Sequence, residues 1–282
     1  MSASRFFSSA GLRLHVLDHG GAGRPVVFLH GGSAHARWWD FVVPHLGDGL
    51  HAYALDLRGH GDSEWARDGA YAIEDYARDL SRMLEAFGLE EPALVGHSFG
   101  SFVGLHYAVA HPRELSALVL VDGRASFGGS GSRTLKLLGM FGAAEYGTLE
   151  EAVGKFRPLP KETIAAPQVV EHVARHGFRK QGERWTTKFD RASLASHAAF
   201  DLKNRLGELD VPVLFVRGER SEVISAAAAA QLAAACRQGA VVEIPQAHHH
   251  VLIDRPEELG REIAEFLKRV AKDAQKAPRV LP

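Results

Sequence analysis

The first part of the chain alternates between short, largely apolar runs and longer stretches with helical spacing of apolar residues. Runs of this length and composition are typical of strands buried on both faces of a parallel sheet. A regular alternation of strand and helix predicts right-handed crossovers and an α/β fold. The predicted strands are residues 25–29, 50–55, 92–95 and 115–121, and the clearest predicted helices are residues 73–87 and 99–111.

The same alternation appears again in the last quarter of the chain. Strand patterns at residues 211–216 and 240–244 are separated by an alanine-rich helical pattern at residues 225–236. A final amphipathic helix is predicted from Pro256 to about residue 272. At the amino terminus, residues 5–9 and 12–17 alternate apolar and polar positions, and we expect two strands joined by a turn.

Residues 124–209 interrupt this rhythm, because they contain no convincing buried strand. A Gly/Ser-rich link is followed by helix-like segments, and we interpret the region as a helical cap; peripheral helices of the main domain are the alternative. We therefore expect a core formed by residues 1–123 and 210–272, and a polar, proline-containing flexible tail at 273–282. The helix-like segments are residues 134–141, 149–156, 161–176 and 192–206.

One strand ends in the sequence Gly96-His97-Ser98-Phe99-Gly100, and a helical pattern follows at once. Strand, serine and helix in this order are the context of a nucleophile elbow, in which a tight turn holds the serine oxygen clear of the backbone. The flanking glycines are expected because side chains there would collide with neighbouring backbone. The motif predicts that Ser98 is a nucleophile, although Gly-x-Ser-x-Gly alone also occurs in ordinary turns.

The loops after the last two strands carry the other residue types that an activated serine requires. A serine hydroxyl needs an imidazole to take its proton and a carboxylate to orient that imidazole. Acidic residues follow the strand at 211–216, and His248, His249 and His250 follow the strand at 240–244. Because the carboxyl ends of parallel strands meet at one edge of a sheet, we expect these loops to lie near Ser98.

These motifs, in this order, resemble the α/β-hydrolase superfamily over residues 6–270. The matching features are His30-Gly31-Gly32 after the third strand, the run at 56–63, the elbow, the interrupting region, and the late acid and histidine loops. The chain is most similar to the capped group that includes esterases, lactonases, carbon–carbon bond hydrolases and cofactor-free haloperoxidases. The resemblance implies a mostly parallel eight-stranded sheet flanked by helices, with a helical cap inserted after the sixth strand.

The resemblance also implies roles for individual residues. Relatives place an acid a few residues after the glycine that closes the penultimate strand, which indicates Glu222 here, in place of the usual aspartate. The alternative acid is Asp122, at the end of the preceding strand. Relatives carry a proline seven residues after the catalytic histidine, so counting back from Pro256 selects His249, with His248 as the alternative.

Two backbone amides are expected to stabilise the oxyanion that forms on a substrate carbonyl. The resemblance indicates the amide of Gly32, in the His-Gly-Gly loop, and the amide of Phe99, which follows the nucleophile. Four side chains are candidates for the substrate pocket, and packing within the core or the cap is the alternative for each. They are His30, Trp38, His97 and Trp185.

Composition excludes several functional classes. The net charge of −1 argues against a nucleic-acid partner, and no apolar run has transmembrane length, so we expect no membrane association. The first residues lack the apolar segment of a signal peptide. Cys236 is the single cysteine, which excludes an internal disulfide and suits a reducing compartment, so we expect a cytoplasmic protein.

We predict a serine hydrolase that cleaves a carboxylic ester of a small molecule through an acyl-enzyme, without a cofactor. A carbon–carbon bond hydrolase or perhydrolase with the same triad is an alternative, and a ligand receptor on the same scaffold is another. Three successive histidines in one loop do not easily converge on one ion, and no helical His-x-x-x-His supports them, so we expect no metal.

Overall fold

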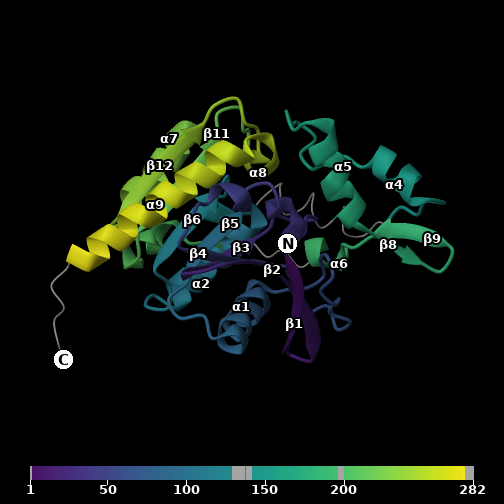
Figure 1. Cartoon of the computed structure of the whole chain (residues 1–282), viewed down its shortest axis with the longest axis horizontal. Helices are drawn as coiled ribbons and strands as arrows, with labels where there is room; N and C mark the ends of the chain where they lie inside the picture. Colours follow the sequence, from purple (N-terminus) through teal and green to yellow (C-terminus); the bar gives the residue numbers. More distant parts are fainter. Residues whose placement is uncertain (1, 129–136, 138–141, 196–199, 277–282) are drawn as a thin grey trace.

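The computed structural model describes residues 2–128, 137, 142–195 and 200–276, and its centre is an eight-stranded sheet (Figure 1). The first two strands pair antiparallel, β2 pairs antiparallel with β4, and all the remaining pairs are parallel. This mostly parallel sheet confirms the predicted fold class. In spatial order the strands are β1 (Ala3–Ser9), β2 (Leu12–Gly21), β4 (Leu50–Leu55), β3 (Arg24–Leu29), β5 (Ala93–His97), β6 (Ala117–Val121), β11 (Val213–Gly218) and β12 (Gly239–Ile244).

Helices cover both faces of the sheet and close two hydrophobic cores. One core contains α1 (Ile73–Phe87), α2 (Phe99–Ala110) and α7 (Ala226–Ala235), and the other contains α8 (Val251–Asp254) and α9 (Pro256–Lys276). In Figure 1, α9 runs along the side of the molecule opposite α1. It continues to Lys276, past the predicted end at residue 272, and residues 277–282 of the predicted tail lie outside the described residues.

The segment that follows β3 forms two short 3-10 turns rather than a continuous helix. They are η1 (Ala36–Trp39) and η2 (Val43–His45). Pro44 lies within the second turn, and proline has no backbone N–H to continue a helical ladder. Trp39 is fully buried against Phe28, so the turns contribute large side chains to the core despite their irregular backbone.

The register of the parallel strands brings several strand ends together at one edge. His97 at the end of β5 pairs with Val121 at the end of β6, and Val121 pairs with Val216 of β11. Gly218 at the end of β11 pairs with Ile244 at the end of β12. The residues that follow these four strands therefore start from neighbouring positions, which is where open α/β sheets bind ligands.

A buried carboxylate fixes the loop that follows β4. Asp56 accepts hydrogen bonds from His15 Nδ1 (2.7 Å) and from the backbone N–H groups of Ala36 (2.6 Å) and Asp62 (2.9 Å). Burial opposes ionisation of Asp56, but the hydrogen bond and charge of His15 outweigh it and hold the pKa of this carboxyl below its usual range. The run at 56–63 is thus a structural anchor between the amino-terminal strands and η1.

The region between β6 and β11 contains helices and a hairpin that extend to one side of the sheet (Figure 1). The hairpin was not predicted, because its strands are short, mostly polar and lack an apolar run. Residues 192–206 do not form the one predicted helix, and the predicted segment 134–141 lies outside the described residues except for residue 137. The elements are β7 (Ser126–Phe127), α4 (Leu149–Lys155), α5 (Pro167–His176), β8 (Phe178–Gln181), β9 (Arg184–Thr187), α6 (Ala192–Ala195), β10 (Phe200–Asp201) and η3 (Lys203–Glu208).

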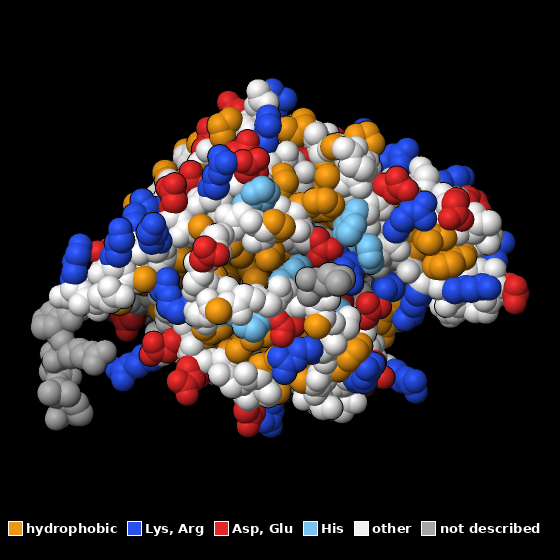
Figure 2. Space-filling model, viewed as in Figure 1, with side chains coloured by type: hydrophobic (Ala, Val, Ile, Leu, Met, Phe, Trp, Pro, Cys, Tyr) orange, Lys and Arg blue, Asp and Glu red, His pale blue; other side chains and the backbone are white. Residues whose placement is uncertain are grey.

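Several of the contacts between this region and the sheet domain are polar. His35 Nε2 donates to the carbonyl of Val173 (2.8 Å), and His172 hydrogen-bonds Asp40 (2.8 Å). In Figure 2, histidine side chains are visible across the middle of this face, between the two parts of the molecule. No helix among the described residues is long and apolar enough to cross a membrane.

The buried ion pair between Arg58 and Asp79 of α1 gives a prediction about stability. Each side chain is 1% exposed, and two hydrogen bonds of 2.6 and 2.7 Å join them. Asp79→Ala would leave a buried guanidinium without its partner, so we expect a loss of about 3–5 kcal/mol in the free energy of unfolding.

Arg82→Ala is the matched control on the same helix, since Arg82 and Glu85 form an exposed pair that is expected to contribute at most about 1 kcal/mol. Urea denaturation of the two variants measures the difference. Equal losses in both variants would contradict the structural role assigned to Asp79.

Candidate active site

Ser98 occupies a strained turn between β5 and α2. Its backbone has φ of 51° and ψ of −112°, a conformation that L residues rarely adopt. A Cβ atom at Gly96 would lie 2.3 Å from the carbonyl oxygen of Gly100, and one at Gly100 would lie 2.3 Å from that of Leu29. Both glycines are therefore required by the close approach of α2 to β5 and β3, which holds Ser98 at the sheet edge, where it is half-buried.

A continuous chain of hydrogen bonds joins Ser98, His249 and Asp122. The Nε2 atom of His249 lies 3.0 Å from Ser98 Oγ, and its Nδ1 atom lies 2.7 Å from Asp122 Oδ2. A carboxylate only accepts, so Nδ1 carries the hydrogen and Nε2 offers its lone pair to the serine hydroxyl. This is the tautomer that a general base needs for removing a proton from serine.

The prediction that Glu222 holds the histidine is wrong, and Asp122, the alternative acid, occupies that position. Asp122 is fully buried, and it also accepts hydrogen bonds from the Gly218 N–H (3.2 Å) and the Ser221 hydroxyl (2.5 Å). Glu222 is exposed on the loop after β11. Together with His249 Nδ1, the Gly218 N–H and the Ser221 hydroxyl give the buried carboxylate three hydrogen-bond donors.

The conformation of the loop after β11 explains why Glu222 lies away from the histidine. The guanidinium of Arg217 donates to the carbonyl oxygens of Glu219, Ser221 and Ile224, which curls the loop around this buried side chain. In this arrangement Ser221, rather than Glu222, reaches the buried carboxylate. Sequence reasoning missed Ser221, because a serine between an arginine and a glutamate in a loop carries no signal of its own.

The structure brings His249, rather than its neighbours, to Ser98. His248 is half-buried, and its backbone N–H donates to Asp254 (2.8 Å). His250 is buried, and its Nε2 donates to the carbonyl of Pro160 (2.8 Å). Counting back from the proline thus selects the histidine that hydrogen-bonds the serine.

His30 supports the glycine loop and does not face a pocket. It is fully buried, its Nδ1 donates to the Gly31 carbonyl (2.7 Å), and its Nε2 accepts from the Leu57 N–H (3.0 Å). Burial lowers the pKa of His30, in keeping with the neutral ring that this pattern requires. Gly32 has no atom within 4 Å of the position that a Cβ would take, so it borders open space beside this loop.

Two of the other pocket candidates, Trp38 and His97, lie against the histidine run, and one lies in the region between β6 and β11. Trp38 is buried with its ring centroid 5.3 Å from that of His250. His97 is buried, and its Nε2 donates to the His249 carbonyl (2.9 Å), which fixes the backbone of that residue. Trp185 packs in a small cluster with Ala152, Ala174 and Phe178, and contributes to the packing of that region.

Comparisons with known proteins agree with this architecture. The family model for the α/β hydrolase fold matches residues 24–256. A protein of Variovorax paradoxus named for carbamate hydrolysis, RutD, is 29% identical over 92% of this chain and 97% of its own length. Esterase Rv0045c of Mycobacterium tuberculosis is 29% identical over 87% of this chain and 83% of its own length.

Among solved structures, E-2-(acetamidomethylene)succinate hydrolase superposes with a TM-score of 0.82 and 24% identity, covering 95% of this chain and all of that chain. At this identity the likeness shows the fold alone. Because the family model covers most of the chain, the protein belongs to the α/β-hydrolase fold family, as the sequence motifs indicated. The two relatives named above are hydrolases of different types.

The hydrogen bond between Asp122 and His249 predicts which acid matters for turnover of an activated ester. We expect Asp122→Asn to lower kcat by about 10⁴-fold, because the amide favours the wrong tautomer of His249. Glu222→Gln is the matched control on the exposed loop and is expected to leave kcat nearly unchanged. Steady-state hydrolysis of p-nitrophenyl acetate, with circular dichroism to verify folding, measures both, and a larger loss in Glu222→Gln would contradict the geometry.

Buried neutral histidines predict how stability changes with pH. Burial lowers the pKa of His250 to about 3 and that of His35 to about 4. Above the unfolded-state pKa of about 6.5 both states are neutral, but below it the unfolded chain binds protons that the native protein does not. Stability is therefore lost as the pH falls, and each histidine is expected to account for about 2 kcal/mol between pH 7.5 and 5.

Urea denaturation at several pH values measures this slope. We expect His35→Gln and His250→Gln each to make the dependence on pH shallower than in the original protein. An unchanged slope in both variants would contradict the assignment of neutral, buried rings.

Proposed function

We propose that this protein is a serine hydrolase that cleaves a carboxylic ester of a small molecule through an acyl-enzyme intermediate. The observation that carries the proposal is the unbroken hydrogen-bond chain from Asp122 through His249 to the half-buried Ser98. The family and an esterase among its relatives support a hydrolytic reaction at an acyl group.

In the first half of the reaction, Ser98 Oγ attacks the carbonyl carbon of the ester, and His249 Nε2 takes the hydroxyl proton. The imidazolium that results carries its charge next to the ionised carboxylate of Asp122, which stabilises it. His249 then gives the proton to the departing alkoxide, so that the alcohol leaves and the acyl group remains on Ser98.

The negative charge on the carbonyl oxygen needs donors at the same edge. We assign this role to the backbone amides of Gly32, beside open space, and Phe99, the first residue of α2. Each donor of this kind is typically worth about 3 kcal/mol of barrier. Because amides in the first turn of a helix point along its axis, the start of α2 has the polarity that an oxyanion requires.

In the second half, water replaces the alcohol and His249 Nε2 removes its proton as it attacks the acyl carbon. The tetrahedral intermediate collapses, Ser98 recovers its proton from His249, and the carboxylic acid is released. The chain supplies the nucleophile, the base and the charge stabilisation for both halves, so the proposed reaction requires no cofactor.

A carbamate or amide substrate is the second candidate, since the relative named for carbamate hydrolysis matches nearly the whole chain. The same nucleophile and base would act on that carbonyl, but His249 must then protonate a nitrogen leaving group. Carbon–carbon bond cleavage and perhydrolysis would use the same residues. A ligand receptor on this scaffold would instead bind without efficient turnover.

A substrate panel tests the proposal with Ser98→Ala as the control in every assay. We expect p-nitrophenyl esters of short to medium acyl length to be hydrolysed, and Ser98→Ala to lose at least about 10⁴-fold in kcat while its thermal unfolding remains cooperative. An alkyl carbamate, a lactone and a vinylogous diketone complete the panel. Turnover that survives in Ser98→Ala would contradict the assignment, and binding without turnover would favour a receptor.

A further inference from the structure

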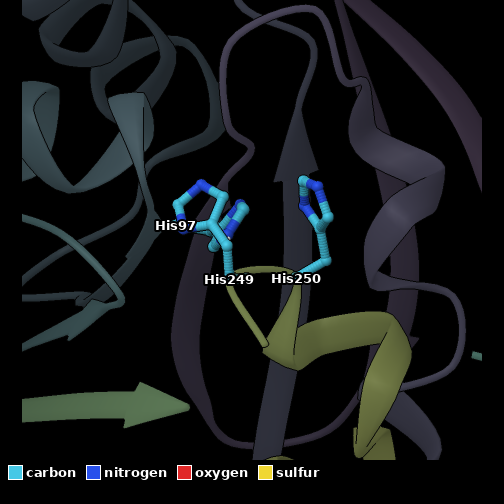
Figure 3. A group of neighbouring side chains, drawn as sticks. All are labelled: His97, His249 and His250. Atoms are coloured by element: carbon cyan, nitrogen blue, oxygen red, sulfur yellow. The ribbon is translucent and has the colours of Figure 1, made fainter. Parts of the chain in front are cut away.

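Three histidine rings meet beside Ser98, and only one of them takes part in the proposed reaction. His249 and His250 come from the turn before α8, and His97 ends β5 (Figure 3). The ring centroid of His249 lies 4.8 Å from that of His97 and 5.0 Å from that of His250, and the third separation is 5.9 Å. The cluster is therefore compact and includes a residue from outside the histidine run.

Each of the three rings donates its one hydrogen to an oxygen that can only accept. His249 Nδ1 donates to Asp122, His97 Nε2 to the His249 carbonyl, and His250 Nε2 to the Pro160 carbonyl. The Nδ1 atoms of His97 and His250 are consequently unprotonated. Both atoms are buried and have no hydrogen-bond partner among the described residues, which is costly for a polar group in a protein interior.

This pattern is the one that histidine ligands of metal ions show. A metal-bound histidine almost always donates its other N–H to a carboxylate or a backbone carbonyl, which fixes the tautomer and raises the basicity of the ligating nitrogen. All three rings have such a partner. Asp122 would then orient His249 both as a metal ligand and as the general base.

The spacing of the rings also fits a tetrahedral ion. With bonds of about 2.0–2.1 Å from zinc to nitrogen, the centroids of three imidazoles on one ion lie roughly 5 Å apart, close to the observed separations. One ring nitrogen of each histidine lies within 4.8 Å of the others. Ligating nitrogens on such an ion are about 3.4 Å apart, so we expect the rings to draw closer together when an ion binds.

The hydrogen-bond pattern leaves lone pairs that suit a cation. The Nδ1 atoms of His97 and His250 carry no hydrogen, because each ring donates from Nε2 to a backbone carbonyl. Neutral imidazole nitrogens suit Zn²⁺, Cu²⁺ and Ni²⁺ rather than Mg²⁺ or Ca²⁺.

We propose that His97, His249 and His250 form a three-histidine site for a divalent transition-metal ion, represented by Zn²⁺, and that its occupation switches the hydrolase off. The ion takes the Nε2 lone pair of His249, which Ser98 needs for the transfer of its proton. The fourth coordination position faces Ser98 Oγ, 3.0 Å from Nε2, and is left for water. The proposal has two halves: the binding half, that the three histidines hold the ion, and the inhibitory half, that the bound ion stops hydrolysis. Only the inhibitory half rests on the proposed function.

The sequence indicated no metal because three successive loop residues do not converge on one ion. The structure changes the ligand set: His97 from β5 replaces His248, whose ring does not belong to the cluster. His248→Gln is therefore a matched control, one residue away from the cluster in the same turn. His97→Gln and His250→Gln each remove one proposed ligand that is not the general base.

The binding half is tested on chelator-treated Ser98→Ala protein, which keeps every ligand and has no turnover to interfere. Isothermal titration calorimetry with ZnCl₂ is expected to show one ion bound per chain. The Co²⁺-loaded protein is expected to show the strong visible absorption of a tetrahedral site. In this background, His250→Gln and His97→Gln should each weaken binding by at least about 100-fold, and His248→Gln should not. Absence of binding, or equal affinity in all variants, overturns the proposal.

The inhibitory half is tested by ester hydrolysis in zinc-buffered solution, with each variant compared with its own zinc-free rate. We expect Zn²⁺ to inhibit at the concentration that saturates the site, EDTA to restore the rate, and the inhibition constant to rise at least about 100-fold in His250→Gln but not in His248→Gln. Zinc bound without inhibition overturns the switch. Zinc binding by a protein that hydrolyses no substrate would count against the proposed function alone.

Discussion

The hydrogen bond from His249 to Asp122 is the interaction on which the arrangement of the site depends. It spans two loops that follow different strands, and it exists because the parallel register places the ends of β5, β6, β11 and β12 at one edge. A buried carboxylate is stable only when its charge is compensated, and here the Gly218 N–H, the Ser221 hydroxyl and the imidazole do this together. The loop after β11 therefore donates hydrogen bonds to Asp122, which follows β6, and does not supply the carboxylate itself.

The tight turn at Ser98 and the fold could be predicted from the sequence because their causes are local. The apolar runs specify buried strands, and Gly96 and Gly100 leave room for a turn in which Ser98 is strained. The acid could not be predicted in the same way. Asp122 and Glu222 both follow a strand end, and the choice depends on the course of the loop around Arg217, which is set by three backbone carbonyls rather than by side-chain type.

Fewer elements of the region between β6 and β11 could be predicted from the sequence, for a related reason. Helix α5 is amphipathic and ends near its predicted boundary at His176, since one face packs against the protein and imposes a helical period. The strands of the β8–β9 hairpin have only four residues each and mostly polar side chains, so they carry no period that distinguishes a strand from a loop. Pattern analysis is informative only where an element is long enough to repeat its buried positions.

The hydrogen bond from His250 to the Pro160 carbonyl joins two segments that lie 90 residues apart in the chain. Pro160 belongs to the segment between α4 and α5, whereas His250 precedes α8 and is adjacent to His249. Thr163 and Ile164 of the first segment also hydrogen-bond Asp254 of α8. The tautomer of His250 is thus set by an oxygen from the region between β6 and β11, so the polarity of a ring beside His249 depends on how that region packs against the sheet domain.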